Sequence, residues 1–278
     1  MSYALAKLCH PDAATYGALA AALEGRLAEL DPGGLASLAW ANATAGGASA
    51  SLFSSLGEEA ARRLEAFAPH DLSLLAWAFA VADADASLLF DDPKGRFVAR
   101  CAQLHDEAAF GYLALSQLHQ WHLWRTERGR RGLPPDLRQD CLGEFSRRES
   151  GTTVSNAEGS VLDALESLGL RPRRTVVTTE GYEVDLMVAL PADAGTGAVA
   201  TEVATEVAIE VDGPGHFLAD GVTPSGRTRL KRRQLRHFGT AALVSVSTAE
   251  LEGLRPRERA AHLQQLLREA TADRRRRR

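Results

Sequence analysis

A repeated run of residues near the N-terminus limits what this chain can fold into more than any other feature. The run Asp31-Pro-Gly-Gly-Leu-Ala-Ser-Leu-Ala-Trp-Ala aligns with Ala68-Pro-His-Asp-Leu-Ser-Leu-Leu-Ala-Trp-Ala. This alignment puts Trp40 and Trp77 37 residues apart. A period in the thirties is typical of paired helices stacked as a solenoid. We therefore predict helical repeats over residues 1–125, with a period of about 37.

A third, degenerate copy is expected to start at Leu115, followed by Trp121 and Trp124. Two or three copies are few for a stable solenoid, so an ordinary helical bundle with chance similarity is the alternative. In both interpretations Trp121 and Trp124 are expected in the core.

The cysteines and histidines give little sign of a structural metal or a disulfide. Cys9, Cys101 and Cys141 are odd in number and widely spaced, which excludes a disulfide scaffold and favours a reducing compartment. Cys101/His105 and His119/His122 have the spacing of helical metal ligands, but neither pair has a convincing matching second pair. We expect no zinc site.

The second half of the chain changes pattern. Residues 126–151 are polar and are predicted to be a connector with one helix at 136–145. Beyond them we expect a helix at 156–168, strands at 173–179, 182–190 and 204–212, a helix at 227–238, a strand at 241–246 and a helix at 262–270. The fold class is thus a helical-repeat region followed by a small α+β domain at 152–254. A C-terminal helix and a basic tail follow at 255–278, and the five terminal arginines are expected to be disordered.

Charge is distributed unevenly along the chain. Residues 221–278 hold 15 Lys and Arg against 5 Asp and Glu, a balance of +10, while the other 220 residues have a balance of −14. A basic end points to a polyanionic partner, nucleic acid before membrane. No run approaches the roughly 20 apolar residues of a membrane span. The first ten residues have neither a secretory signal pattern nor the arginines of a clear transit peptide, so we expect an intracellular soluble protein.

Three acids are predicted to gather on one face of the expected sheet. A hairpin centred between Gly197 and Ala198 would put Asp185 opposite Glu210 on the neighbouring strand, and alternation adds Asp212 to the same face. Carboxylates this close need a metal, a lysine or raised pKa values, and hard oxygen ligands favour Mg²⁺. The alternative is an edge face with solvated acids.

The segment after these acids resembles a known domain. Its runs are Ile209-Glu-Val-Asp-Gly-Pro-Gly-His-Phe217, Gly226-Arg-Thr-Arg-Leu-Lys-Arg-Arg-Gln-Leu-Arg-His-Phe-Gly239 and Leu243-Val-Ser-Val-Ser247. Together they resemble the RAP domain over about Glu206 to Leu254. The N-terminal repeats are similar to the octotricopeptide and FAST-kinase-like repeats that often precede such a domain.

The resemblance implies RNA binding and RNA metabolism in mitochondria or chloroplasts, and a fold like that of restriction endonucleases. Asp185 falls where those nucleases place a metal-binding aspartate, and Glu210 matches the next acid. Asp212 stands where the nuclease motif has lysine, so this departure argues against catalysis.

Two further residues are candidates for the same site. A helical wheel puts Lys231 on the inward face of its helix, where it would be either a relocated catalytic lysine or a structural counter-ion for the acids. His216 follows the Gly213-Pro214-Gly215 turn and would be a general base, a phosphate ligand or a locally bonded turn residue.

Three functions follow from these patterns. The preferred one is a non-catalytic protein that binds single-stranded RNA, with outward arginines gripping the backbone. Those arginines are Arg227, Arg229, Arg232, Arg233 and Arg236. The alternative is a Mg²⁺-dependent endoribonuclease using Asp185, Glu210 and Asp212, assisted by Lys231 or His216. The third is a scaffold that binds protein partners through its acidic helical repeats.

Overall fold

The computed structural model describes residues 13–47, 49–149, 156–190, 205–239 and 241–277, which form two compact units. The helical unit contains the described residues up to Phe145 together with His216–Gln234. The sheet unit contains the described residues of Ser146–Gly215 and those from Leu235 onward. The predicted 152–254 domain is thus divided, because a stretch of 19 residues within it belongs to the helical unit.

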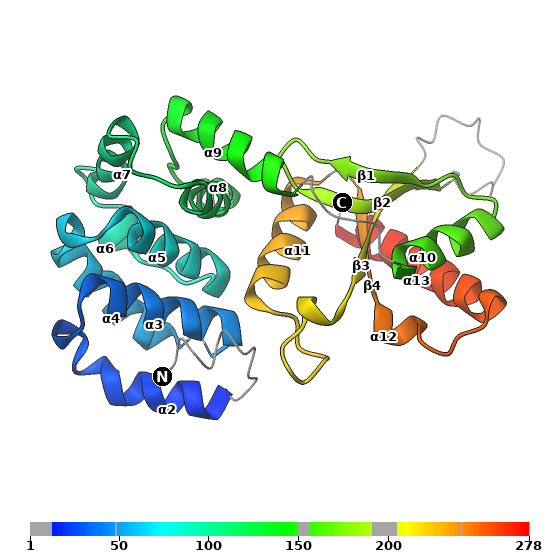
Figure 1. The fold of residues 1–278 in the computed structure, drawn as a ribbon, viewed down its shortest axis with the longest axis horizontal. Coiled ribbons are helices and arrows are strands. Elements are labelled where there is room, and N and C mark those ends of the chain that lie inside the picture. The colour runs from blue at the N-terminus through cyan, green and yellow to red at the C-terminus, as the bar shows by residue number, and fades with distance from the viewer. Residues whose placement is uncertain (1–12, 48, 150–155, 191–204, 240, 278) are drawn as a thin grey trace. The chain divides into compact units, whose positions relative to one another are not determined.

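The helical unit is built from successive helix pairs (Figure 1). The elements are α2 (Ala13–Glu24), η1 (Leu27–Glu29), α3 (Pro32–Ala45), α4 (Ala50–Arg62), η2 (Leu64–Ala66), α5 (Pro69–Ala82), α6 (Ser87–Phe90), α7 (Arg96–Asp106), α8 (Tyr112–Glu127) and α9 (Pro135–Glu149). Helices α3 and α5 begin 37 residues apart, the same spacing as the repeated run in the sequence. The connector helix predicted at 136–145 is confirmed as α9.

The repeat starts are fixed by local chemistry. Pro32 and Pro69 each occupy the first turn of their helix, where a missing N–H costs nothing and the ring angle is already helical. Asp31 caps α3 by accepting the N–H of Gly34 at 2.7 Å.

The same arginine position joins one repeat to the next. Arg26, Arg63 and Arg100 are each 37 residues apart in the sequence. Arg63 donates to the carbonyl of Leu30 in the preceding repeat at 2.8 Å. Arg100 forms an ion pair with Glu65 of its preceding repeat at 3.5 Å. This spacing extends the period into a third repeat.

The third repeat departs from the first two. Its start keeps the 37-residue spacing, because α6 begins 37 residues after α4. Its first helix, however, is broken into α6 and α7. Helix α8 then begins 43 residues after α5, six more than the period. Trp77 of α5 donates its indole N–H to Gln120 of α8 at 2.8 Å, so α8 continues the row of α3 and α5. Trp121 and Trp124 are buried as predicted, while the third copy itself stays a prediction.

The sheet unit has the predicted order of elements. These are α10 (Asn156–Ser167), β1 (Arg173–Val177), β2 (Glu183–Leu190), β3 (Thr205–Asp212), η3 (Pro214–His216), α11 (Gly226–Phe238), β4 (Ala242–Ser247), α12 (Thr248–Leu251) and α13 (Pro256–Arg277). Of these, residues His216–Gln234, which include the first nine residues of α11, lie in the helical unit. Helix α13 is longer than predicted and includes arginines expected to be disordered, so that prediction was wrong.

The four strands form one mixed sheet in the order β1-β2-β3-β4. Strands β1 to β3 pair antiparallel, while β3 and β4 pair parallel across the α11 connection. Leu186 lies opposite Ile209, which is the register predicted for the hairpin, although its centre lies outside the described residues. Alternate side chains such as Val188 and Val207 enter a core with α10 and α13, so the predicted division of faces is confirmed.

Candidate nucleic-acid interface

Helix α11 carries the five arginines predicted to bind RNA, and Arg229 is the first whose position differs from the prediction. Its guanidinium donates to the carbonyl of Ala43, near the C-terminal end of α3, at 2.7 Å, and to Pro224 at 2.9 Å. The last four carbonyls of a helix have no partner within the helix and carry its negative dipole end. Arg229 satisfies one of them, and burial lowers its pKa from the usual value.

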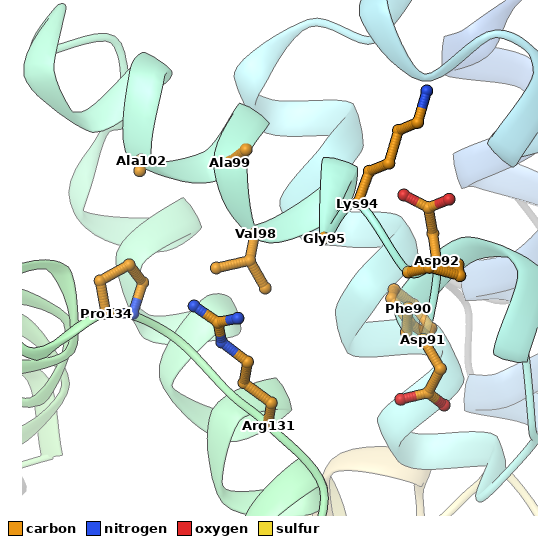
Figure 2. A pocket seen from close by; sticks show the side chains of 11 residues that line it. Phe90, Asp91, Asp92, Lys94, Gly95, Val98, Ala99, Ala102, Arg131 and Pro134 are labelled. Carbon is orange, nitrogen blue, oxygen red and sulfur yellow. The ribbon is translucent and has the colours of Figure 1, made fainter.

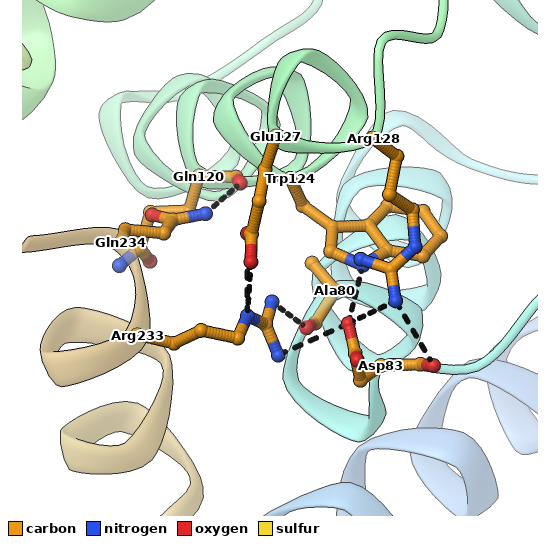
Figure 3. A network of polar contacts seen from close by, with 8 residues as sticks. All are labelled: Ala80, Asp83, Gln120, Trp124, Glu127, Arg128, Arg233 and Gln234. Carbon is orange, nitrogen blue, oxygen red and sulfur yellow. Dashed lines mark hydrogen bonds and ion pairs between the residues drawn. The ribbon is translucent and has the colours of Figure 1, made fainter. Parts of the chain in front are cut away.

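Arg233 does the same one helical turn later. It donates to the carbonyl of Ala80, near the end of α5, at 2.7 Å. It also forms ion pairs with Glu127 at 3.1 Å and with Asp83 at 3.3 Å (Figure 3). Only 26% of its side chain is exposed. Ala43 and Ala80 are 37 residues apart, so successive arginines of α11 bind the same carbonyl of successive repeats.

Asp83 is the hub of this network. Trp124 donates its indole N–H to the Asp83 carboxylate at 2.9 Å, and Arg128 pairs with the same group (Figure 3). Burial alone would raise the pKa of Asp83, but the Trp124 hydrogen bond and the charges of Arg233 and Arg128 outweigh it and lower that pKa. The carboxylate is held ionised to anchor the arginines.

Close packing fixes the start of α11 against the repeats. A Cβ added to Gly226 would lie 2.9 Å from the Cα of Thr44 and 3.0 Å from the Ala43 carbonyl. Leu230 is fully buried in the core of the helical unit, and the Gln234 side chain donates to the Gln120 carbonyl of α8 at 2.8 Å. This half of α11 is therefore a structural part of the repeat stack.

The predicted outward arginine face is corrected accordingly. Arg229 and Arg233 face the repeats because helix C-termini supply carbonyl acceptors that a helical wheel drawn for α11 alone does not contain. Arg227 and Arg236 are exposed as predicted, and Arg232 is half-buried. A helical wheel separates only polar from apolar residues, and a guanidinium also packs well at a polar interface.

The acids of the predicted metal site lie on one face but are engaged structurally. The confirmed register, continued by one residue, puts Asp185 opposite Glu210. The Asp185 carboxylate accepts the backbone N–H of Val211 at 2.7 Å, where the β2–β3 ladder has ended. It thus replaces a missing ladder bond.

Asp212 and Glu210 are both buried, at 1% and 2% exposure. Asp212 accepts the hydroxyl hydrogen of Ser245 on β4, the parallel neighbour of β3. Among the residues that the structure describes, no three His, Cys, Asp or Glu side chains are arranged to hold a metal ion. The Mg²⁺ site predicted at Asp185, Glu210 and Asp212 stays a prediction.

Lys231 and His216 have the remaining predicted roles. Lys231 is half-buried on α11, and its role as counter-ion or catalyst stays a prediction. The His216 backbone carbonyl accepts the N–H of Ser225 and the hydroxyl of Thr228, both at 2.9 Å. This closes the loop before α11, which supports the turn role for its backbone.

A basic surface on the sheet unit was not predicted. Glu206 pairs with Arg173 of β1 through its carboxylate, and its carbonyl accepts from Arg274 of α13 at 3.5 Å. Arg171 and Arg174 are exposed beside Arg173, and no acid occurs in residues 167–179. Arg173 and Arg174 project to opposite faces of the edge strand β1. We use the name β1 patch for Arg171, Arg173, Arg174 and Arg274. Its sequence signal was the acid-free run; the junction with α13 was not visible in the sequence.

The His119–His122 spacing has a structural explanation at His122. Its Nδ1 accepts the backbone N–H of Leu133 at 3.0 Å. Burial, together with the charges of His119 and Arg138, lowers the pKa of His122 to about 4. Neutral imidazole is therefore the form the fold requires.

No known protein-family model matches this sequence, and no curated protein is significantly similar to it. In the described part of the chain, no helix is both long and apolar enough to cross a bilayer.

Proposed function

We propose that this chain is a non-catalytic RNA-binding protein whose sheet unit contacts the RNA backbone through the β1 patch. The observation that carries this proposal is the meeting of two arginine-rich segments, about 100 residues apart in sequence, at Glu206. Guanidinium groups spaced along an edge strand suit phosphates, which they bind with two N–H donors. The exposed Arg227 and Arg236 are proposed as further contacts.

The resemblance to the RAP domain supports the same function and its setting. The proposed role is in the processing, stability or translation of transcripts in mitochondria or chloroplasts. The element order α10-β1-β2-β3-α11-β4, with β3 and β4 parallel, supports our proposal that the sheet unit has a restriction-endonuclease-like fold. Fold likeness by itself assigns no activity.

The acid face supports binding rather than cleavage. Asp185 and Asp212 each accept a hydrogen bond that the sheet needs. We expect labelled RNA to stay intact with the protein in Mg²⁺ and in Mn²⁺. Cleavage by the wild type that disappears in both Asp185→Asn and Glu210→Gln would overturn the non-catalytic proposal.

The binding test compares two double variants on a labelled 12-nucleotide single-stranded RNA. Arg173→Ala/Arg174→Ala removes two cations of the β1 patch. Arg255→Ala/Arg257→Ala removes two exposed arginines from the start of α13.

Each lost phosphate contact on a single strand reduces the salt slope of log K by about 0.7. The patch variant should therefore lose about 1.4 in slope and about ten-fold in affinity near physiological salt. Equal losses in both variants, with both folds intact, would contradict the patch; no binding by the wild type would contradict RNA binding itself.

A further inference from the structure

The third repeat contains a cavity at the point where it departs from the first two. The first helices of the earlier repeats, α2 and α4, are continuous, but here a turn at residues 91–95 separates α6 from α7. The cavity of about 380 Å³ lies between this turn and the loop that joins α8 to α9 (Figure 2). Its size is within the range of pockets that hold small ligands.

Two cations line the cavity, and its acids are already engaged. Asp91 forms an ion pair with Arg125, whose side chain is only 2% exposed. Asp92 accepts the Arg96 backbone N–H at 3.1 Å and pairs with the Arg96 side chain at 3.3 Å.

Lys94 and Arg131 are the cations of the lining, and both are exposed. In Figure 2 the Arg131 guanidinium points toward Val98 and Pro134, whereas the Lys94 side chain extends away from it. With both acids neutralised by arginines, the charge left at the cavity is positive.

The cavity is held in shape before any ligand arrives. Arg125 pairs with Asp91 in the turn and also donates to the backbone carbonyl of Arg131 at 3.1 Å. One buried side chain therefore joins the two walls. Because that contact uses the carbonyl of Arg131, its side chain stays available. Val98, Ala99 and Pro134 supply the apolar part of the lining, and Val98 and Pro134 lie beside the Arg131 guanidinium (Figure 2).

We infer that this cavity binds one nucleotide, with its phosphate on Arg131 and its base on the apolar residues of the lining. The inference rests on the proposed function and adds a second RNA contact, in the helical unit. A phosphate needs cations, and a base needs a dry surface for its face. The same chemistry fits a nucleotide of a bound RNA or a free mononucleotide, and the experiment separates the two sources.

The test uses adjacent arginines that differ in one respect. Arg131 lines the cavity, whereas Arg130 is exposed outside its lining. Arg131→Ala and Arg130→Ala remove the same charge. Ala99→Trp fills the cavity without changing charge. Each full-length variant is measured with the labelled 12-nucleotide RNA over a range of salt, and with AMP by saturation-transfer NMR, after its thermal unfolding has been compared with wild type.

We expect Arg131→Ala to lower RNA affinity three-fold or more and the salt slope by about 0.7, with little change in Arg130→Ala. Ala99→Trp should lower the RNA affinity by a similar factor and should also lower the salt slope by about 0.7, because one phosphate contact is lost. If RNA binding depends on the β1 patch but Arg131→Ala and Ala99→Trp match Arg130→Ala, the inference is overturned while the proposed function stands. If wild type binds no RNA, AMP signals that vanish in Ala99→Trp support a free-nucleotide site, and their absence in wild type overturns it.

Discussion

The arginines of α11 and those of β1 differ in whether their charges are bound within the fold. On α11, Arg229 and Arg233 donate to backbone carbonyls at the ends of α3 and α5, and Arg233 is also paired with two acids. On β1, Arg173 forms an ion pair with Glu206, while the neighbouring Arg174 is exposed. The residue type is the same, so its environment decides whether the charge stabilises the fold or remains available to a ligand.

The comparison shows why an arginine-rich helix is a poor guide to a binding surface. A helix end presents carbonyls that water or a side chain must satisfy, and an arginine can satisfy several at once. The repeats present such ends in a regular row. Two arginines one turn apart on helix α11 donate to the helix ends of two successive repeats.

The largest effect should come from Arg233→Ala. It removes the ion-pair partner of Glu127 and one of the partners of Asp83, and it leaves the Ala80 carbonyl without its donor. We expect the free energy of unfolding to fall by about 2–3 kcal/mol, below the 3–5 of a fully buried pair because the side chain is partly exposed. Urea unfolding measures it. Arg227→Ala, on the exposed side of the same helix, should cost about 0.5 kcal/mol or less. Equal losses would erase the distinction between the two faces.

Gly226→Ala tests the packing of α11 without touching a charge. The new Cβ would approach the backbone of α3 at 2.9 Å, and backbone has little room to move. We expect a loss of about 1–3 kcal/mol, the usual cost of overpacking. Gly213→Ala is the control, since nothing lies within 4 Å of its added Cβ. A Gly226 variant as stable as its control would mean that α11 does not pack tightly on the repeats.

The pH dependence of stability tests whether His122 is held neutral inside the helical unit. Its folded pKa, about 4, lies below the unfolded value of about 6.5, so the unfolded chain binds more protons between these values. The stabilisation by neutral His122 should be complete above about pH 6.5 and decline as the pH falls toward 4.

His122→Asn keeps an acceptor for the Leu133 N–H but cannot titrate. Its unfolding free energy should vary less with pH than that of wild type over this window. Parallel pH profiles of the two proteins would show that another group controls acid sensitivity.

The smallest change in stability should follow Arg174→Ala in the β1 patch. Its side chain is exposed, and removing it should shift the unfolding free energy by about 0.5 kcal/mol or less. RNA affinity should nevertheless fall, because a phosphate contact is lost. A large stability loss in Arg174→Ala would mean that this arginine, like Arg233, stabilises the fold, and the contrast between the units would then not hold.

The sequence by itself determined the local elements and the pairing of the strands. The 37-residue period, the proline at the start of α3 and of α5, and the register that sets Asp185 opposite Glu210 all follow from short-range patterns. Each depends on the backbone geometry of one helix or one hairpin, which the side-chain spacing reveals.

Tertiary structure alone decided which partners the charged groups have. The Ala43 and Ala80 carbonyls that bind Arg229 and Arg233 lie more than 150 residues earlier, and a backbone acceptor has no sequence pattern of its own. The junction of β1 with α13 at Glu206 and the cavity beside Arg131 likewise bring together distant segments. Whether a charge is satisfied depends on every group within a few ångströms of it, and that neighbourhood exists only after the chain has folded.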